Sequence, residues 1–207
     1  MNLEEDPQRA SQLCFEAQAR LMHRVSGLSD ADVQAASRLP GWTVGHVLTH
    51  LARNADAHAR RLSGALEGED LPKYPGGPEQ RVREIGEGAG RPAAETIADL
   101  RASMLRLGEV FTLSAEAGWP NGHLMGEDLY GVAACPARRL REVEMHHVDL
   151  GLGYTPADWP EEYVAWDLPM LLATVPERLG SPDGQRRFMA WLAGRGPLAP
   201  ETKLADW

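Results

Sequence analysis

Apolar residues recur at the helical period in four long stretches of this chain, which limits the folds open to it. The stretches run from about residue 7 to 25, from Thr43 to about Leu66, from Ala93 to Ala117, and onward from Pro136. The third shows the pattern most clearly, with Ile97, Leu100, Met104, Leu107 and Phe111. Each apolar stripe needs a partner surface, and helices satisfy one another by packing side by side. We therefore predict an all-α protein built on a four-helix bundle.

Helix ends and breakers refine this prediction. Thr43 is a good N-cap because its hydroxyl can accept a hydrogen bond from an early free N–H, and Pro136 suits the first turn of the fourth helix. The many Gly and Pro residues of segment 68–91 predict a long loop with at most a short helix. A loop or a short extended pair is expected from His123 to Ala133.

The length of 207 residues suits one main domain with a small appendage. We assign residues 1–160 to the bundle and residues 161–207 to a short C-terminal extension. Helical patterns at about 161–179 and 182–193 predict that this extension is mainly helical.

Composition narrows the class of protein. Hydrophobic residues make up 43% and charged residues 25%, as in soluble globular proteins. The net charge of -9 disfavours nucleic acid as a partner, because binding its backbone needs a concentrated cationic surface. The N-terminus is acidic and no stretch approaches transmembrane length, so we expect a cytoplasmic protein without a membrane partner. Two cysteines, Cys14 and Cys135, fit a reducing compartment and are expected to be buried structural residues.

A candidate metal site lies in the fourth helical stretch. Glu142 and His146 are four residues apart, so a helix places them on one face. His50 offers a third ligand on the second helix. Two histidines and one carboxylate form an incomplete coordination shell that leaves positions open for chemistry. Glu144 and His147 form a rival pair, three residues apart.

Other polar residues near these positions have two interpretations each. Glu142 could instead pair with Arg138 or Arg139 on the helix surface. Asp149 could orient a histidine ligand or simply be a solvated acid at the helix end. The residues that share the general face of His50, and that either line a cavity there or are incidental, are His46, Asn54 and His58.

Three motifs in the first 160 residues carry a family resemblance. They are Leu39-Pro40-Gly41-Trp42-Thr43-Val44-Gly45-His46-Val47-Leu48-Thr49-His50-Leu51-Ala52, then Tyr74-Pro75-Gly76-Gly77 followed by Arg81 and Glu84-Ile85, and finally Glu142 through Gly153. In their order and spacing the chain resembles the mycothiol-dependent maleylpyruvate isomerases, which are DinB-like metal-binding bundles. The family pattern of Glu, three residues and His favours Glu142 and His146 over the rival pair.

The resemblance implies a site and a reaction. It implies a divalent ion, usually zinc, held by His50, Glu142 and His146, with Asp149 completing the motif. Mycothiol would be the thiol cosubstrate, and the reaction would convert maleylpyruvate to fumarylpyruvate in gentisate-type aromatic catabolism. A thiolate that adds to the conjugated double bond permits rotation before it leaves again. Arg81, with Arg83 as competitor, would bind a carboxylate of the dicarboxylate substrate.

The resemblance is weaker at the C-terminus. Family members commonly append a small α/β domain, whereas residues 161–207 show no convincing run of strands. The arginines there that could contact substrate are Arg186, Arg187 and Arg195. The alternative functions are a mycothiol S-transferase or another thiol-dependent DinB-like enzyme, and a noncatalytic metal-binding bundle. The metal could also be iron, nickel or cobalt, and the oligomeric state is open.

Overall fold

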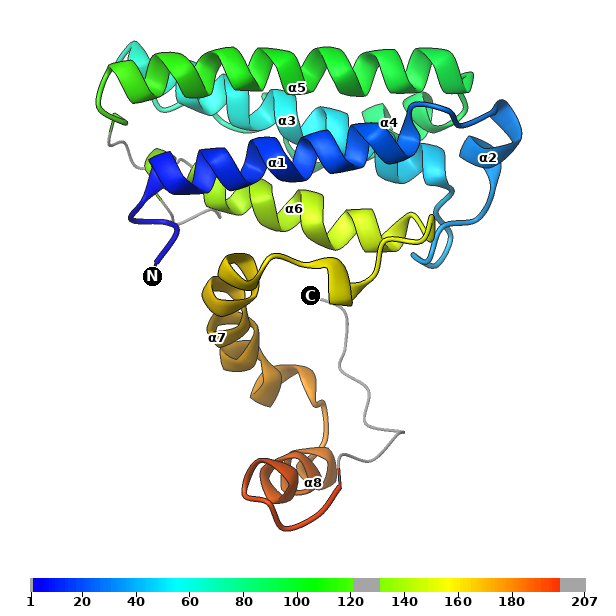
Figure 1. The fold of residues 1–207 in the computed structure, drawn as a ribbon, viewed down its shortest axis with the longest axis vertical. Coiled ribbons are helices and arrows are strands. Elements are labelled where there is room, and N and C mark those ends of the chain that lie inside the picture. Colours follow the sequence, from blue (N-terminus) through cyan, green and yellow to red (C-terminus); the bar gives the residue numbers. More distant parts are fainter. Residues whose placement is uncertain (1, 121–130, 198–207) are drawn as a thin grey trace. The chain divides into compact units, whose positions relative to one another are not determined.

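The computed structural model describes residues 2–120 and 131–197, which divide into two compact units, Asn2–Trp159 and a second that begins at Pro160 (Figure 1). Within the described ranges the regular elements are all helices, with one isolated bridge between Ala36 and Thr43. The predicted all-α class is therefore confirmed. That residues 1–160 and 161–207 are separate domains stays a prediction. Most of the loop expected from His123 to Ala133 lies outside the described residues.

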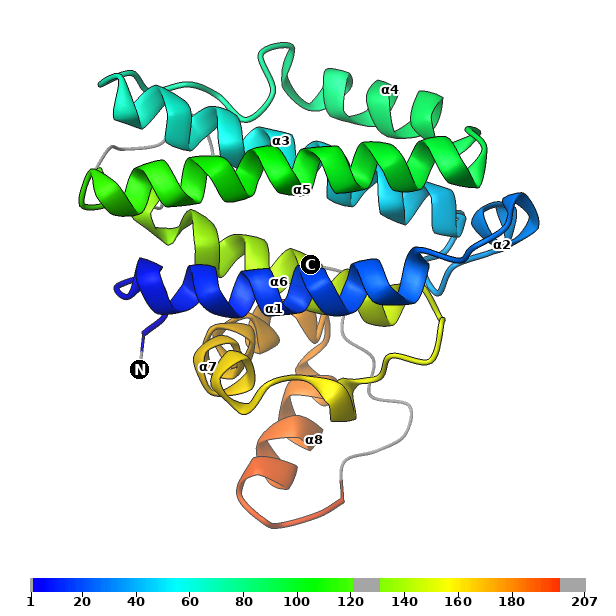
Figure 2. The ribbon, with the colours of Figure 1, turned by 45° about the horizontal axis from the view of Figure 1, so that its top comes forward.

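The first unit is the predicted four-helix bundle, made of α1 (Pro7–Val25), α3 (Val44–Leu66), α5 (Ala93–Glu116) and α6 (Cys135–Asp149). Helix α3 packs against both α5 and α6, and α1 packs against the same two helices from the other side of the core (Figures 1 and 2). The apolar stripes meet in the centre, where the largest fully buried residues include Leu21, Leu48, Leu51, Leu62, Leu100, Leu107, Phe111 and Leu140. Burial of these side chains is the main favourable contribution to folding.

The start of α3 is defined by Thr43, as predicted. Its hydroxyl accepts a hydrogen bond from the backbone N–H of His46 at 3.3 Å, while the His46 Nδ1 accepts one from the Thr43 N–H at 3.2 Å. This is a reciprocal capping box in which histidine takes the place usually held by Glu or Gln. His46 therefore fixes the end of the helix that carries His50.

The segment from Gly68 to Arg91 contains more helix than its composition predicted, because α4 (Gly77–Ala89) is 13 residues long. The expectation of at most a short helix was wrong. Pro78 occupies the first turn, where its missing N–H costs nothing. Gly88 lies where α4 crosses α3, and a Cβ added there would lie 2.4 Å from Thr49 Cγ2. This glycine permits close packing of α4 on α3; the two helices are labelled in Figure 2.

The remaining elements are short or lie in the second unit. Helix α2 (Asp30–Gln34) begins with a capping box between Ser29 and Asp32, and 3₁₀ turns occupy Val132–Ala134 and Pro156–Asp158. The second unit holds α7 (Glu161–Arg178) and α8 (Pro182–Leu192). Among the described residues, no helix combines the length and the apolar character that a membrane crossing requires.

Two glycines of α4 provide a test of this packing. Gly88→Ala should lower the free energy of unfolding by about 1–3 kcal/mol, because the new methyl group overpacks the contact with Thr49. Gly86→Ala should be neutral or should stabilise by up to about 1 kcal/mol, because its Cβ meets nothing within 4 Å and alanine favours helix. Urea unfolding of the two variants measures the difference. Equal stability would contradict the close contact.

Candidate metal centre

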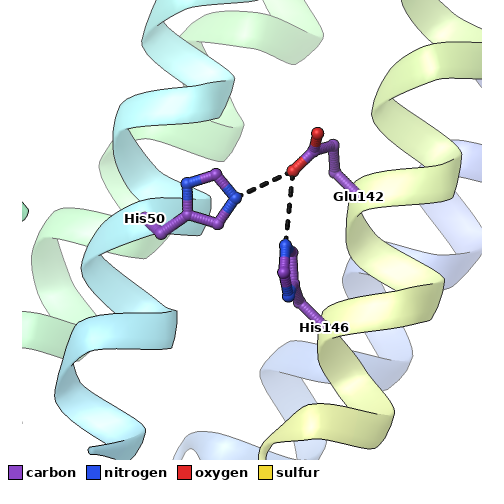
Figure 3. Close-up of side chains that lie close together, drawn as sticks. All are labelled: His50, Glu142 and His146. Atoms are coloured by element: carbon purple, nitrogen blue, oxygen red, sulfur yellow. Dashed lines mark hydrogen bonds and ion pairs between the residues drawn. The ribbon is translucent and has the colours of Figure 1, made fainter. Parts of the chain in front are cut away.

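His50, Glu142 and His146 form one cluster between α3 and α6 (Figure 3). Each residue offers one ligand atom, and these atoms lie within 4.8 Å of one another. The Nε2 atom of His50 is 2.8 Å from Glu142 Oε2, and the Nε2 atom of His146 is 3.6 Å from that oxygen. Within the part of the chain that the structure describes, no other group of three such residues could hold a metal ion. The structure therefore brings together the three residues expected from helical spacing.

Burial of the cluster is uneven. The His50 side chain is only 3% exposed, whereas the Glu142 and His146 side chains are 32% and 21% exposed. His50 is held within the bundle by the second turn of α3, while the two residues of α6 lie nearer to solvent. A site of this kind is anchored on one side and accessible on the other, as a reactive centre must be.

Asp149 fixes the ring of His146. Its Oδ2 atom lies 2.8 Å from His146 Nδ1 and accepts the proton there, so that Nε2 is directed toward Glu142. Burial alone would lower the pKa of His146, but the hydrogen bonds with Asp149 and Glu142 outweigh it and raise that pKa to about 9. A carboxylate in this position is what commonly orients a metal-binding imidazole.

Glu142 is the common partner of both histidines. Burial alone would raise the pKa of Glu142, but hydrogen bonds from His146 and His50 hold it well below its usual range. The residue is therefore a carboxylate at neutral pH. Two imidazole nitrogens and one carboxylate oxygen are a donor set that suits zinc and related divalent metals, and three protein ligands leave coordination positions open. The residues present thus fit a catalytic type of metal site.

Arg81 reaches the cluster from α4. Its Nη2 atom is 3.2 Å from His50 Nδ1, and because a guanidinium can only donate, this nitrogen of the ring accepts. Arg81 also bonds to the half-buried Tyr74, and burial raises the pKa of that phenol to about 12. Arg83, its competitor in the sequence, is exposed. The structure therefore brings Arg81 to the cluster.

The rival pair, Glu144 and His147, belongs to a different interface. Glu144 accepts hydrogen bonds from Arg20 of α1 at 2.7 Å and from the Tyr154 hydroxyl at 2.5 Å. The His147 ring stacks on Tyr154, with ring centres 3.8 Å apart and an angle of 4° between the planes. Glu144 thus joins α6 to α1, while His147 packs on the segment that follows α6, and these contacts lie apart from the His50 cluster.

The cysteines are both fully buried, as expected for structural residues. Burial raises the pKa of the Cys14 thiol to about 12, so it stays protonated at neutral pH. Cys135 lies at the start of α6 but has no exposed surface. Neither cysteine has the exposure that a reactive thiol needs.

Two aromatic residues near the cluster had no role assigned from the sequence. The Trp42 ring stands edge-on to His50, with centres 5.8 Å apart, and lies 6.0 Å from His46. Tyr74 bonds to Arg81. Both residues fall within the family-like motifs, which was the available signal, but only the folded arrangement shows that they lie beside His50 and Arg81.

The three C-terminal arginines remain without an assigned role. Arg187 forms an ion pair with Asp183 of the same helix, with 2.8 Å between their charged atoms. Arg195 donates to the backbone oxygen of Ala193. These contacts lie within the second unit and do not distinguish a substrate-binding residue among Arg186, Arg187 and Arg195.

A helical bundle with two histidines and one glutamate converging between two helices defines a class of candidate metal-dependent proteins. Comparison with known families gives a narrower result. Residues 14–151 match the model of the mycothiol maleylpyruvate isomerase N-terminal domain, and the chain belongs to this family.

Solved structures agree with this assignment. A crystal structure of the mycothiol-dependent maleylpyruvate isomerase is similar to this chain, with 27% sequence identity and a TM-score of 0.73. A histidine-to-alanine mutant of that enzyme matches with 26% identity and the same TM-score. Each similarity covers 80% of this chain and 70% of the other. Comparison with curated proteins gave no significant match.

The adjacent histidines of α6 allow a matched test of metal binding. His146→Ala should weaken Zn²⁺ binding by about 100-fold or more, because it removes a ligand and not merely the group that orients one. His147→Phe should bind Zn²⁺ like the wild type, because this ring stacks on Tyr154 away from the cluster. Isothermal titration with Zn²⁺ measures both affinities. An equal loss in the two variants would contradict the assignment.

Proposed function

We propose that this protein is a metal- and mycothiol-dependent isomerase that converts maleylpyruvate to fumarylpyruvate in gentisate-type aromatic catabolism. The observation that carries the proposal is the convergence of His50, Glu142 and His146 within 4.8 Å in a chain of this family. These three residues would hold a divalent ion, for which zinc is our first candidate. Mycothiol and a dicarboxylate are the small-molecule partners in this proposal.

The reaction requires a double bond to rotate. A thiolate adds to the alkene of maleylpyruvate in conjugation with a carbonyl, which leaves a single bond and an enolate. Rotation about that bond, followed by return of the electron pair and expulsion of the thiolate, gives the trans alkene. The thiol is regenerated, so no oxidant or reductant is needed. A divalent ion bound at the site would favour the thiolate form of the cosubstrate at neutral pH.

The protein's own groups prepare this chemistry. Asp149 holds the Nδ1 proton of His146, so the Nε2 atom of that ring remains directed toward the centre of the cluster. If His50 bound a metal through Nε2, its remaining proton would be on Nδ1, and that nitrogen would no longer accept a hydrogen bond from Arg81. Arg81 would then be available to bind a substrate carboxylate next to the reacting double bond.

Turnover of maleylpyruvate by the Zn²⁺-loaded protein, with and without mycothiol, tests the proposal. We expect fumarylpyruvate to form only with the thiol, and kcat/KM to fall roughly 1,000-fold in His50→Ala, because metal participation contributes several kcal/mol to such reactions. His46→Gln is the control, since glutamine can retain the capping box of α3. Ultraviolet absorbance follows the rate, and NMR identifies the product.

Two results would replace the isomerase proposal. A thioether product that accumulates with consumption of mycothiol would indicate an S-transferase. Metal and thiol binding without turnover of maleylpyruvate would indicate a noncatalytic bundle.

A further inference from the structure

Helix α6 carries a buried arginine one turn before Glu142. Arg139 has no exposed surface, and its Nη1 atom donates to the Leu51 backbone oxygen and to Asn54 Oδ1, both at 2.8 Å. Its Nε and Nη2 atoms are also buried and have no hydrogen-bond partner among the described residues. A buried donor without a partner is costly, and such a group in a native protein calls for a ligand or water.

The hydrogen bonds of Arg139 among the described residues leave its positive charge without a directly bonded anion. Both acceptors are neutral amide oxygens. Burial lowers the pKa of Arg139, and the more distant Glu142 carboxylate acts against that effect. Glu142, however, already accepts hydrogen bonds from both histidines of the cluster. The guanidinium stays charged in proteins, so an anion at its unpartnered edge would be strongly favoured.

The position of Arg139 relates it to the candidate metal centre. On α3, Asn54 lies one helical turn after His50. On α6, Arg139 lies about one turn before Glu142. The hydrogen bond between Arg139 and Asn54 therefore forms the next layer after the contact between His50 and Glu142. Arg139 also interacts electrostatically with Cys14, Glu142 and Tyr74, which places its guanidinium near Glu142 of the cluster.

The surroundings of the next residue on this face of α3 are also cationic. His58 is 1% exposed, and its Nδ1 atom has no partner among the described residues. Burial lowers the pKa of His58 well below its usual value, and the positive charges of Lys73 and Arg139 lower it further. Glu142 acts in the opposite direction, but its carboxylate is already engaged by the two histidines of the cluster.

We propose that Arg139 is the inner anion-binding residue of the site and takes one carboxylate of the substrate through its Nε and Nη2 atoms. Asn54 acts as the positioning residue that fixes the guanidinium. The naming of a dicarboxylate rests on the proposed function, but the anion site rests on the contacts of Arg139. The paired donors of an arginine match the two oxygens of a carboxylate. With Arg81 at His50, a second guanidinium accompanies the cluster, as a substrate with two carboxylates requires.

Maleate binding tests this proposal without turnover. Isothermal titration of maleate into the Zn²⁺-loaded protein, in the absence of mycothiol, would compare the wild type with Arg139→Lys, which keeps the charge but loses the forked geometry. We expect at least about tenfold weaker binding in this variant, because a single ammonium cannot reproduce the bidentate contact. Arg138→Met is the control, since the neighbouring Arg138 pairs with Glu4.

Thermal unfolding and Zn²⁺ content would show that each variant is folded and loaded. Arg139→Met removes the charge entirely, and if it fails to fold, Arg139→Lys decides the question. A lower unfolding temperature with unchanged maleate affinity would show that Arg139 only holds α3 to α6, and would overturn the proposal. Absence of maleate binding in the wild type would overturn it as well.

Kinetics separate this inference from the proposed function. An isomerase whose KM for maleylpyruvate rises about tenfold or more in Arg139→Lys, with a smaller change in kcat, would support both. The wild type could bind maleate but lack isomerase activity. If Arg139→Lys then lost maleate binding, the result would support the anion site and reject the isomerase. If the wild type is an active isomerase and Arg139→Lys has the same KM, the result would support the isomerase and reject the anion site.

Discussion

The packing of α3 against α6 is the constraint on which the rest of this structure depends. It brings His50 within 2.8 Å of Glu142, although 92 residues separate them in the chain. Placing imidazoles and a carboxylate between two packed helices costs solvation free energy, which a hydrogen-bonded network or a coordinated cation offsets. The bundle therefore supplies a site at the expense of some apolar packing, as functional sites commonly do.

Helix α6 makes polar contacts on two different faces. Glu142 and His146 are directed toward His50 of α3, while Glu144 meets Arg20 of α1 and His147 stacks on Tyr154. The rotation of α6 about its axis decides which pair forms the centre. The second network thus contributes to the site indirectly, because it holds the helix in the orientation that the cluster needs.

Much of the fold was predictable because four amphipathic stripes need one another for burial. The length of helix α4 was underestimated because the segment is rich in Gly and Pro, and only the contact with Thr49 shows why a glycine lies at position 88. Helical spacing identified Glu142 and His146 but could not exclude the pair Glu144 and His147, since the choice depends on which helices pack against α6. Arg139 looked like a surface partner of Glu142 because its burial depends entirely on tertiary packing.

We infer that His50, Glu142 and His146 together hold one divalent ion. Anomalous diffraction at the zinc edge from crystals grown with Zn²⁺ tests this most directly. We predict a single strong peak within about 2.0–2.2 Å of one atom from each of the three residues. A zinc ion bound elsewhere, or an intact hydrogen bond between His50 and Glu142 without an ion beside it at saturating Zn²⁺, would contradict the account.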